Sequence, residues 1–168
     1  MLFNSLEFLV FFPVVTLLYF LLPTLRSRNI FLLIASYYFY MQYKPEYGLL
    51  MLFSTVINYI AAIQMEKAKD NVRKKKLWMG ISIIGTLGVL FFFKYFNFFT
   101  TSLGRGLDLL NISYQPTALD FILPVGISFY TFQTMSYSID VYRGDMLAEK
   151  DFIDLALFIS FFPQLVAG

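Results

Sequence analysis

Long apolar runs alternate with short polar segments along the whole chain. Polar and charged residues gather at 26–29, 44–46, 66–76, 100–120 and 143–151. Between them lie six hydrophobic segments, at roughly 2–22, 29–43, 47–65, 77–99, 121–142 and 152–168. A run of about 20 mostly apolar residues is long enough to cross the hydrocarbon core of a bilayer. The pattern therefore predicts an all-α, polytopic transmembrane helical protein with about six hydrophobic segments.

The first two segments differ in character. Residues 2–22 have no basic residue before the apolar run and no small-residue cleavage site after it, which predicts a transmembrane helix ended by Pro23 and not a signal peptide. The second segment is rich in aromatic residues, at Tyr37, Tyr38, Phe39, Tyr40 and Tyr43. Tyrosine clusters favour the headgroup belt, so this segment is the least typical of a membrane span.

Composition supports the membrane interpretation and removes several classes of protein. The chain of 168 residues is 58% hydrophobic, 20% aromatic and only 14% charged, whereas a soluble domain is typically about a quarter charged. It contains no cysteine and no histidine. Disulfides, thiolate metal sites and Ser-His or Cys-His catalytic arrangements are therefore excluded. No glycine-rich phosphate loop or metal-ligand cluster is visible, so the sequence predicts neither a cofactor nor a metal.

Basic residues are distributed unevenly, which predicts the orientation. Residues 66–76 carry six of the 13 lysines and arginines, so this loop should be cytoplasmic by the positive-inside rule. Alternation of the segments then places Arg26, Arg28, Arg143 and Lys150 on the same side, Lys44 and Arg105 on the other, and the N-terminus outside. A nucleic-acid-binding patch is the weaker interpretation of the basic run, because no folded polar face lies near it.

The fourth segment contains one lysine and three glycines with alternative interpretations. Lys94 lies six residues from the end of the apolar stretch, so its amine either extends to the interface or faces an internal cavity. Gly80, Gly85 and Gly88 suggest close packing against another helix, although they do not keep a strict GxxxG register.

The fifth segment carries polar residues at helical spacing. Five of them follow an i, i+3, i+4, i+7 pattern and so share one helix face: Tyr130, Gln133, Thr134, Tyr137 and Asp140. A face with a glutamine and an aspartate is unfavourable against lipid, so it should turn toward other helices or a wet cavity. Two roles stay open, hydrogen bonding between helices and the lining of a substrate passage. Pro124 and Gly126 suggest a kinked or broken start to this helix.

Several motifs carry a family resemblance. LPVGISFYTFQTMSYSIDVYRG at 123–144 and FISFFPQLVAG at 158–168 closely resemble the bacterial membrane-bound O-acyltransferase (MBOAT) family, in the branch of the alginate O-acetylation and teichoic-acid D-alanylation proteins. Further support comes from the opening MLFNSLEFLVFFPVV, from SYYFYMQYKPEYGLLMLFSTVINYI at 36–60 and from LFFFKYFNFF at 90–99. The resemblance extends over nearly the whole chain but covers only the N-terminal third or so of such proteins. Residues 1–168 are therefore expected to be the N-terminal transmembrane part of an MBOAT domain, truncated from a parent that continues.

The resemblance implies a bacterial inner-membrane, multi-pass enzyme. Such an enzyme would take an acyl group, for example acetyl, from an acyl-CoA or acyl carrier in the cytoplasm. It would transfer that group to hydroxyls of an exported polysaccharide such as alginate, alongside export or acetylation machinery. The lipid bilayer is its other partner, and no nucleic acid is expected. In the family the general base is ascribed to a histidine, so no catalytic residue is named here and the chain alone is expected to be inactive.

A non-catalytic membrane protein, such as a transporter subunit or scaffold, is the alternative function. Polar stripes in membrane helices occur in transporters as well. The acyl group, acceptor sugar and donor carrier are not defined by the sequence.

Overall fold

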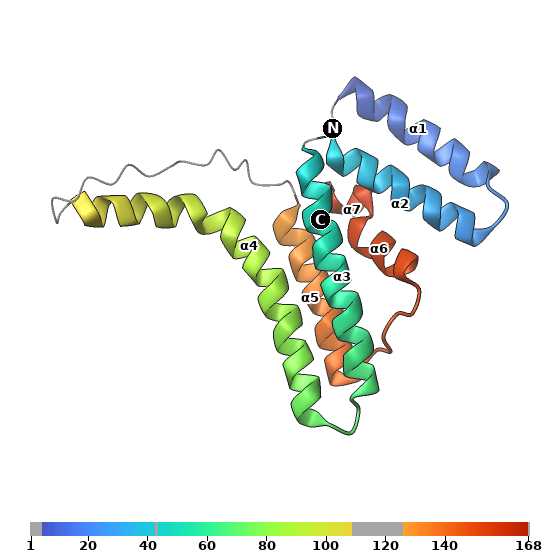
Figure 1. The fold of residues 1–168 in the computed structure, drawn as a ribbon. Helices are drawn as coiled ribbons and strands as arrows, with labels where there is room; N and C mark the ends of the chain where they lie inside the picture. Colours follow the sequence, from blue (N-terminus) through green and yellow to red (C-terminus); the bar gives the residue numbers. More distant parts are fainter. Residues whose placement is uncertain (1–4, 43, 109–125, 168) are drawn as a thin grey trace.

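The computed structural model describes residues 5–42, 44–108 and 126–167. Every element in these ranges is a helix, which confirms the all-α prediction. The helices are α1 (Leu6–Leu21), α2 (Leu25–Met41), α3 (Pro45–Lys67), α4 (Val72–Asp108), α5 (Ile127–Arg143), α6 (Phe152–Ser160) and α7 (Phe162–Ala167). Figure 1 shows α3, the first half of α4 and α5 side by side as a bundle, with α1 and α2 paired beyond it and α6 and α7 between.

Local sequence determines where these helices begin. The side chains of Ser5, Thr24 and Asp151 each accept a hydrogen bond from a backbone N–H in the first turn of the helix that follows. Asn71 does the same for α4, accepting from the Lys74 N–H at 3.1 Å. Pro45 stands at the start of α3, where its missing N–H costs nothing. The short polar segments of the sequence therefore coincide with helix ends.

Two of the predicted hydrophobic segments, the fourth and the sixth, differ clearly from the helices of the structure. The fourth is longer than 77–99, because α4 begins at Val72 and continues to Asp108. The basic run at 66–76 is therefore only partly a loop, since Lys67 ends α3 and residues 73–76 lie in α4. The sixth segment is two helices separated at Phe161, which leaves the helical conformation at φ −54° and ψ 108°. Of the fifth segment, residues 121–125 lie outside the described residues.

Two helices among the described residues are long and apolar enough to cross a membrane. They are Pro45–Lys67 and the Val72–Phe92 part of α4. Leu6–Leu21 and Phe152–Leu165 are apolar but shorter. The aromatic α2 is absent from both groups, in keeping with its predicted atypical character.

A buried asparagine joins the three helices of the bundle. Asn58 of α3 donates from Nδ2 to the Ser54 carbonyl at 2.7 Å and to Thr86 Oγ1 of α4 at 2.8 Å. Its Oδ1 accepts from Ser82 Oγ at 2.5 Å and from Ser138 Oγ of α5 at 2.6 Å. Both amide protons and both lone pairs are used, so this buried polar group is fully satisfied. Asn58 therefore fixes the relative register of α3, α4 and α5.

The glycines of α4 do not all serve packing as predicted. A Cβ added at Gly85 would lie 3.0 Å from Ile57 Cδ1, so this glycine does allow close approach of α3. Nothing lies within 4 Å of a Cβ at Gly80 or Gly88 among the described residues. The close-packing prediction is correct at Gly85 and is not supported at the other two positions.

A second core lies between α1, α2 and α7. Phe39 and Phe162 are buried, with ring centroids 5.5 Å apart, and Phe8 and Phe11 of α1 pack on both. The Phe162 N–H, at the start of α7, donates to Ser36 Oγ of α2 at 3.3 Å. The N-terminal helices are thereby attached to the final segment of the described chain.

Candidate functional site

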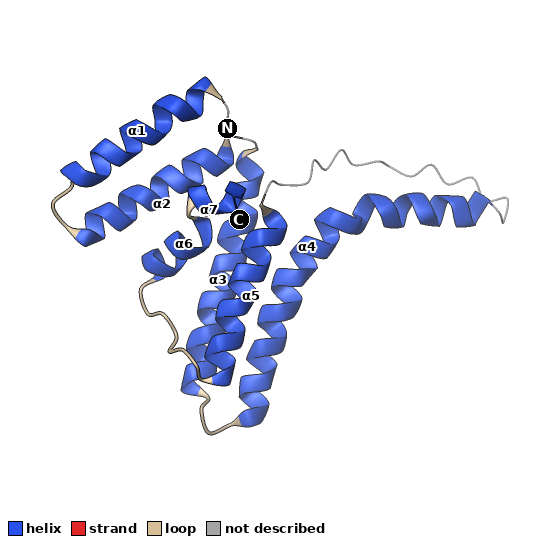
Figure 2. Ribbon diagram, turned by 180° about the vertical axis from the view of Figure 1, so that it is seen from behind, coloured by secondary structure: helices blue, strands red, loops and turns tan. Residues whose placement is uncertain are grey.

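The predicted polar face of α5 lies against protein. Tyr130, Thr134 and Tyr137 are buried, and Gln133 and Asp140 are partly buried. Phe132 of the same helix is 55% exposed. The five predicted residues are thus buried or partly buried on α5, and Figure 2 shows α3 and the first half of α4 packed along this helix, with α6 beside it.

Gly126 determines how α5 begins at this site. It is the N-cap residue of α5 and has φ +78°, in the left-handed region that favours glycine. A Cβ here would lie 2.6 Å from the Leu165 carbonyl oxygen of α7. The positive φ and the short distance to Leu165 both disfavour any residue with a Cβ at this position. The start of α5 therefore lies in direct contact with α7. The sequence prediction of an irregular helix start is met at Gly126, while Pro124 lies outside the described residues.

Gln133 hydrogen-bonds to the break between α6 and α7. Its Nε2 donates to the Phe158 carbonyl at 2.9 Å and to Gln164 Oε1 at 3.4 Å. Carbonyls in the last turn of a helix have no partner within that helix, so the Phe158 carbonyl needs an external donor. Pro163, in the first turn of α7, lacks an N–H and cannot continue the α6 ladder across the break. Gln133 therefore supplies a hydrogen bond that the broken helix lacks.

Tyr137 and Asp140 line a cleft between α5 and α6. This cleft has a volume of about 250 Å³ and is also lined by Glu149, Asp154 and Phe158. The Tyr137 hydroxyl accepts a hydrogen bond from the Glu149 N–H at 2.9 Å, which attaches the 144–151 connection to α5. Asn29 of α2 donates to Asp154 Oδ1 at 2.7 Å. The three carboxylates make this cleft acidic, a poor match for an anionic ligand.

A tyrosine cluster adjoins the first turn of α5, and the sequence had not placed it there. The rings of Tyr40 and Tyr130 have centroids 6.2 Å apart, and Tyr47 lies 6.4 Å from Tyr40. The buried hydroxyls of Tyr37, Tyr40 and Tyr130 have no hydrogen-bond partner of normal geometry within the described residues. The available signal was the i, i+3 spacing of Tyr37 and Tyr40. The aromatic clustering in the sequence predicts the headgroup belt for Tyr37 and Tyr40.

Within the described ranges, no group of three His, Cys, Asp or Glu side chains is arranged to hold a metal ion. The polar groups that converge near α5 are hydroxyls, amides and carboxylates. They can donate and accept hydrogen bonds and orient a hydroxylated or carbonyl-bearing molecule.

Comparison with known proteins confirms the resemblance drawn from the motifs. The chain is 43% identical to the probable alginate O-acetylase AlgI of Pseudomonas aeruginosa and 39% identical to that of Azotobacter vinelandii. It is 33% identical to the peptidoglycan O-acetyltransferase of Helicobacter pylori. Each comparison covers 100% of this chain but only 32%, 34% and 36% of the respective relative. The chain thus spans about a third of the length of the curated relatives it matches.

No family model and no solved structure matches the chain. Its relationship therefore depends on whole-length sequence identity to these relatives, together with two apolar helices of spanning length. The chain is a membrane protein homologous along its full length to the alginate O-acetylases, in agreement with its MBOAT-type motifs.

Proposed function

We propose that residues 1–168 form the N-terminal transmembrane part of an O-acyltransferase that modifies hydroxyls of an exported polysaccharide. The observation that carries the proposal is the inward polar face of α5, which lies within the 123–144 stretch whose motif closely resembles the family. The names of the relatives, alginate O-acetylase and peptidoglycan O-acetyltransferase, support acetyl as the acyl group and a cell-envelope glycan as acceptor. The acyl donor would be an acyl-CoA or acyl carrier from the cytoplasm.

The chemistry requires groups beyond those in this chain. When a hydroxyl oxygen attacks an acyl carbonyl, its proton must pass to a base, and the oxyanion needs hydrogen-bond donors. The chain contains no histidine, the side chain whose ordinary pKa of about 6.5 suits that role. We expect the chain alone to transfer no acyl group. The hydroxyls of Tyr130 and Tyr137 and the amide of Gln133 would contribute to the walls of the substrate passage.

Replacement of Gln133 by leucine in the chromosomal gene tests this role. Loss of the hydrogen bond to the Phe158 carbonyl costs about 0.6 kcal/mol on the average for membrane proteins, which is too little to unfold the bundle. If Gln133 lines the passage, membrane abundance stays near normal while acetylation of the exported polysaccharide falls several-fold. Abundance is measured by immunoblot of membranes, and acetylation by ester content of the purified polysaccharide.

The control for this variant is Phe132→Leu, one residue away on the exposed side of α5. It should change neither abundance nor ester content. Equal loss of abundance and acetylation in Gln133→Leu would assign Gln133 to packing alone. Expression of only residues 1–168 in a strain deleted for the gene should give no ester above background. Ester formation there would place the active centre within this chain.

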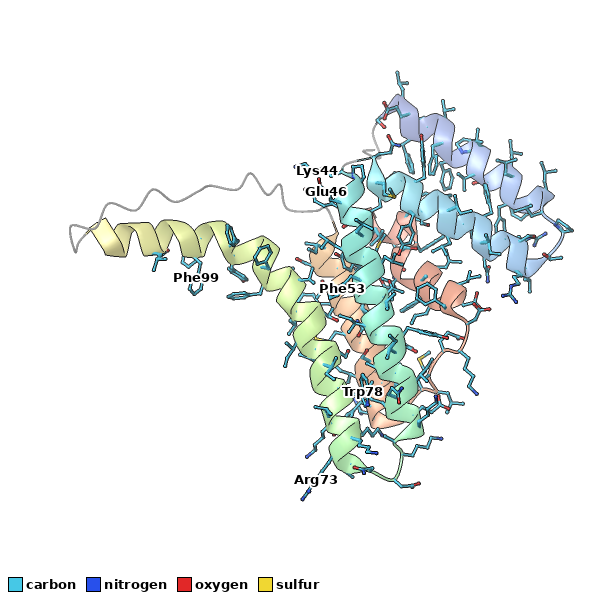
Figure 3. All side chains as sticks on the ribbon, viewed as in Figure 1. Lys44, Glu46, Phe53, Arg73, Trp78 and Phe99 are labelled. Carbon is cyan, nitrogen blue, oxygen red and sulfur yellow. The ribbon has the colours of Figure 1, made fainter. Side chains whose placement is uncertain are left out.

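The proposed membrane is the bacterial cytoplasmic membrane, crossed several times, with the 66–76 region inside and the N-terminus outside. Figure 3 shows Lys44 and Glu46 at one end of the bundle and Arg73 at the other. Lys67, Lys69 and Lys150 surround a single hollow beside the α3–α4 turn. One end of the bundle therefore gathers basic residues from distant parts of the sequence, as the positive-inside rule expects of a cytoplasmic face.

Cysteine labelling checks this orientation directly, because the chain has no cysteine of its own. Asp70→Cys is preferable to a change at the neighbouring Asn71, whose side chain caps α4. A membrane-impermeant maleimide should label Asp70→Cys only after the cells are opened. Glu46→Cys, at the opposite end of α3, should be labelled in intact cells. The reverse pattern would invert the proposed orientation.

A further inference from the structure

Helix α4 is longer than a membrane span requires, and its outer half, residues 93–108, follows the spanning part. α4 has 37 residues, which corresponds to about 55 Å of helix, whereas the hydrocarbon core is about 30 Å thick. The spanning part ends at Phe92. Figures 1 and 2 show that α4 then bends away from α3 and α5 and runs across the direction of the bundle. The helix therefore changes direction where its membrane span is complete.

Aromatic side chains line the inner side of this bend. A hollow of about 430 Å³ is bordered by Phe91, Phe92, Tyr95, Phe96, Phe99 and Leu103. Neighbouring rings contact one another along the helix in tilted pairs, with centroids 5.2 Å apart for Phe91 and Tyr95 and 5.1 Å apart for Phe92 and Phe96. In Figure 3, Phe99 points to the side of the outer half on which the spanning half of α4 lies. The apolar face of the outer half therefore points to the same side as the spanning half of α4.

Lys94 is the single charged residue between Leu77 and Leu103. Helical periodicity places it well away from the aromatic face, about 140° from the centre of that face at 100° per residue. Its side chain is exposed, and its Nζ lies 5.7 Å from the Tyr95 ring centroid. A helix face of aromatic residues with a cation well outside it matches the boundary between acyl chains and headgroups. This position agrees with the interpretation in which the Lys94 amine extends to the interface.

We infer that residues 93–103 of α4 form an interfacial helix, which lies in the plane of the membrane and inserts its aromatic face into the headgroup boundary. The occupant of the apolar hollow is lipid. This surface is continuous with the exposed face of the spanning half, where Ile84 is 74% exposed and Phe91 54%. A straight α4 would instead carry Phe98 and Phe99 into water, at a cost of about 1.5 to 3 kcal/mol for each phenylalanine. The inference uses only the membrane character of the chain and is independent of its enzymatic activity.

Depth measurement with spin labels tests the inference. Single cysteine variants of the full chain carry the nitroxide labels: Tyr95→Cys, Phe99→Cys and Leu103→Cys. The native side chains at these three positions are exposed, so their replacement does not disturb the core. The chain is reconstituted in phosphatidylcholine–phosphatidylglycerol vesicles, and collision rates with oxygen and a water-soluble nickel complex give the depth. All three labels should lie at one depth, about 5 to 10 Å below the headgroup boundary.

Two further labels calibrate the measurement. Ile84→Cys, in the spanning half, should report a much greater depth, and Lys94→Cys should collide more with nickel than Phe99→Cys does. An upright helix would separate Tyr95 and Leu103 by about 12 Å in depth, because each residue rises 1.5 Å. That gradient would overturn the inference. So would free nickel access at all three sites, which indicates water, or exclusion of both reagents, which indicates a protein cover.

Discussion

Replacement of Asn58 by leucine should destabilise the three-helix bundle by about 2 kcal/mol, roughly thirtyfold in the folding equilibrium. The change removes hydrogen bonds to Thr86, Ser82 and Ser138, each worth about 0.6 kcal/mol on the average in a membrane. It also leaves the Ser82 and Ser138 hydroxyls to find other acceptors in a buried site. Unfolding in mixed micelles can be followed through Trp78, the single tryptophan, which packs on the bundle core.

A mutant cycle separates this network from simple packing. Ser82→Ala should cost about 0.6 kcal/mol in the native background and close to nothing in the Asn58→Leu background, where its partner is already lost. Ile60→Leu, at a 43% exposed position on the same helix, is the matched control and should leave stability unchanged. If Ser82→Ala costs the same in both backgrounds, Asn58 does not couple α3 to α4.

Replacement of Gly126 by alanine should cost about 2 to 5 kcal/mol. An L-residue at φ +78° pays about 1 to 2 kcal/mol, and the added Cβ would press on the Leu165 carbonyl oxygen at 2.6 Å. Backbone of α7 must move to relieve that contact, and overpacking of this kind costs about 1 to 3 kcal/mol. The same micelle titration measures the loss. In the proposed enzyme, acetylation should fall as well, because α7 would shift relative to Gln133.

Two other glycines provide controls that isolate each contribution. Gly144 has φ +88° but open space around its Cβ position, so Gly144→Ala should show only the conformational cost of about 1 to 2 kcal/mol. Gly80 is helical with nothing within 4 Å, so Gly80→Ala should stabilise by about 0.5 to 1 kcal/mol. An equal loss for Gly126→Ala and Gly144→Ala would show that the contact with α7 contributes nothing.

The spacing of apolar residues and the short polar segments between them were sufficient to place most helices. The i, i+3, i+4, i+7 spacing that starts at Tyr130 predicts one helix face, and Tyr130, Thr134 and Tyr137 on that face are buried in the structure. The end of α4 was not predictable in the same way. Residues 100–108 are polar enough to suggest a loop, yet nothing in them prevents a helix from continuing.

The contacts that organise the site depend on residues far apart in the sequence. Asn58 meets Ser138 across 80 positions, and Gln133 meets the Phe158 carbonyl across a helix break. No local pattern specifies which asparagine or glutamine will find such partners. Hydrophobicity alone predicts one segment over 152–168. The signal for the break at Phe161 is Pro163, because proline has no N–H to donate. The role of Tyr40 beside Tyr130 likewise required the fold.

Phe162 packs against α1 and α2. These two helices are synthesised first, whereas Phe162 is synthesised more than 100 residues later. Its ring packs on Phe39 and Phe11, and its N–H donates to Ser36. At about 5 to 20 residues per second, the ribosome needs about 6 to 25 seconds to pass from Phe39 to Phe162. During that interval the aromatic face of the α1–α2 pair has no α7 to close it. Ribosome stalling between the two phenylalanines would prolong the time for which this aromatic face is uncovered.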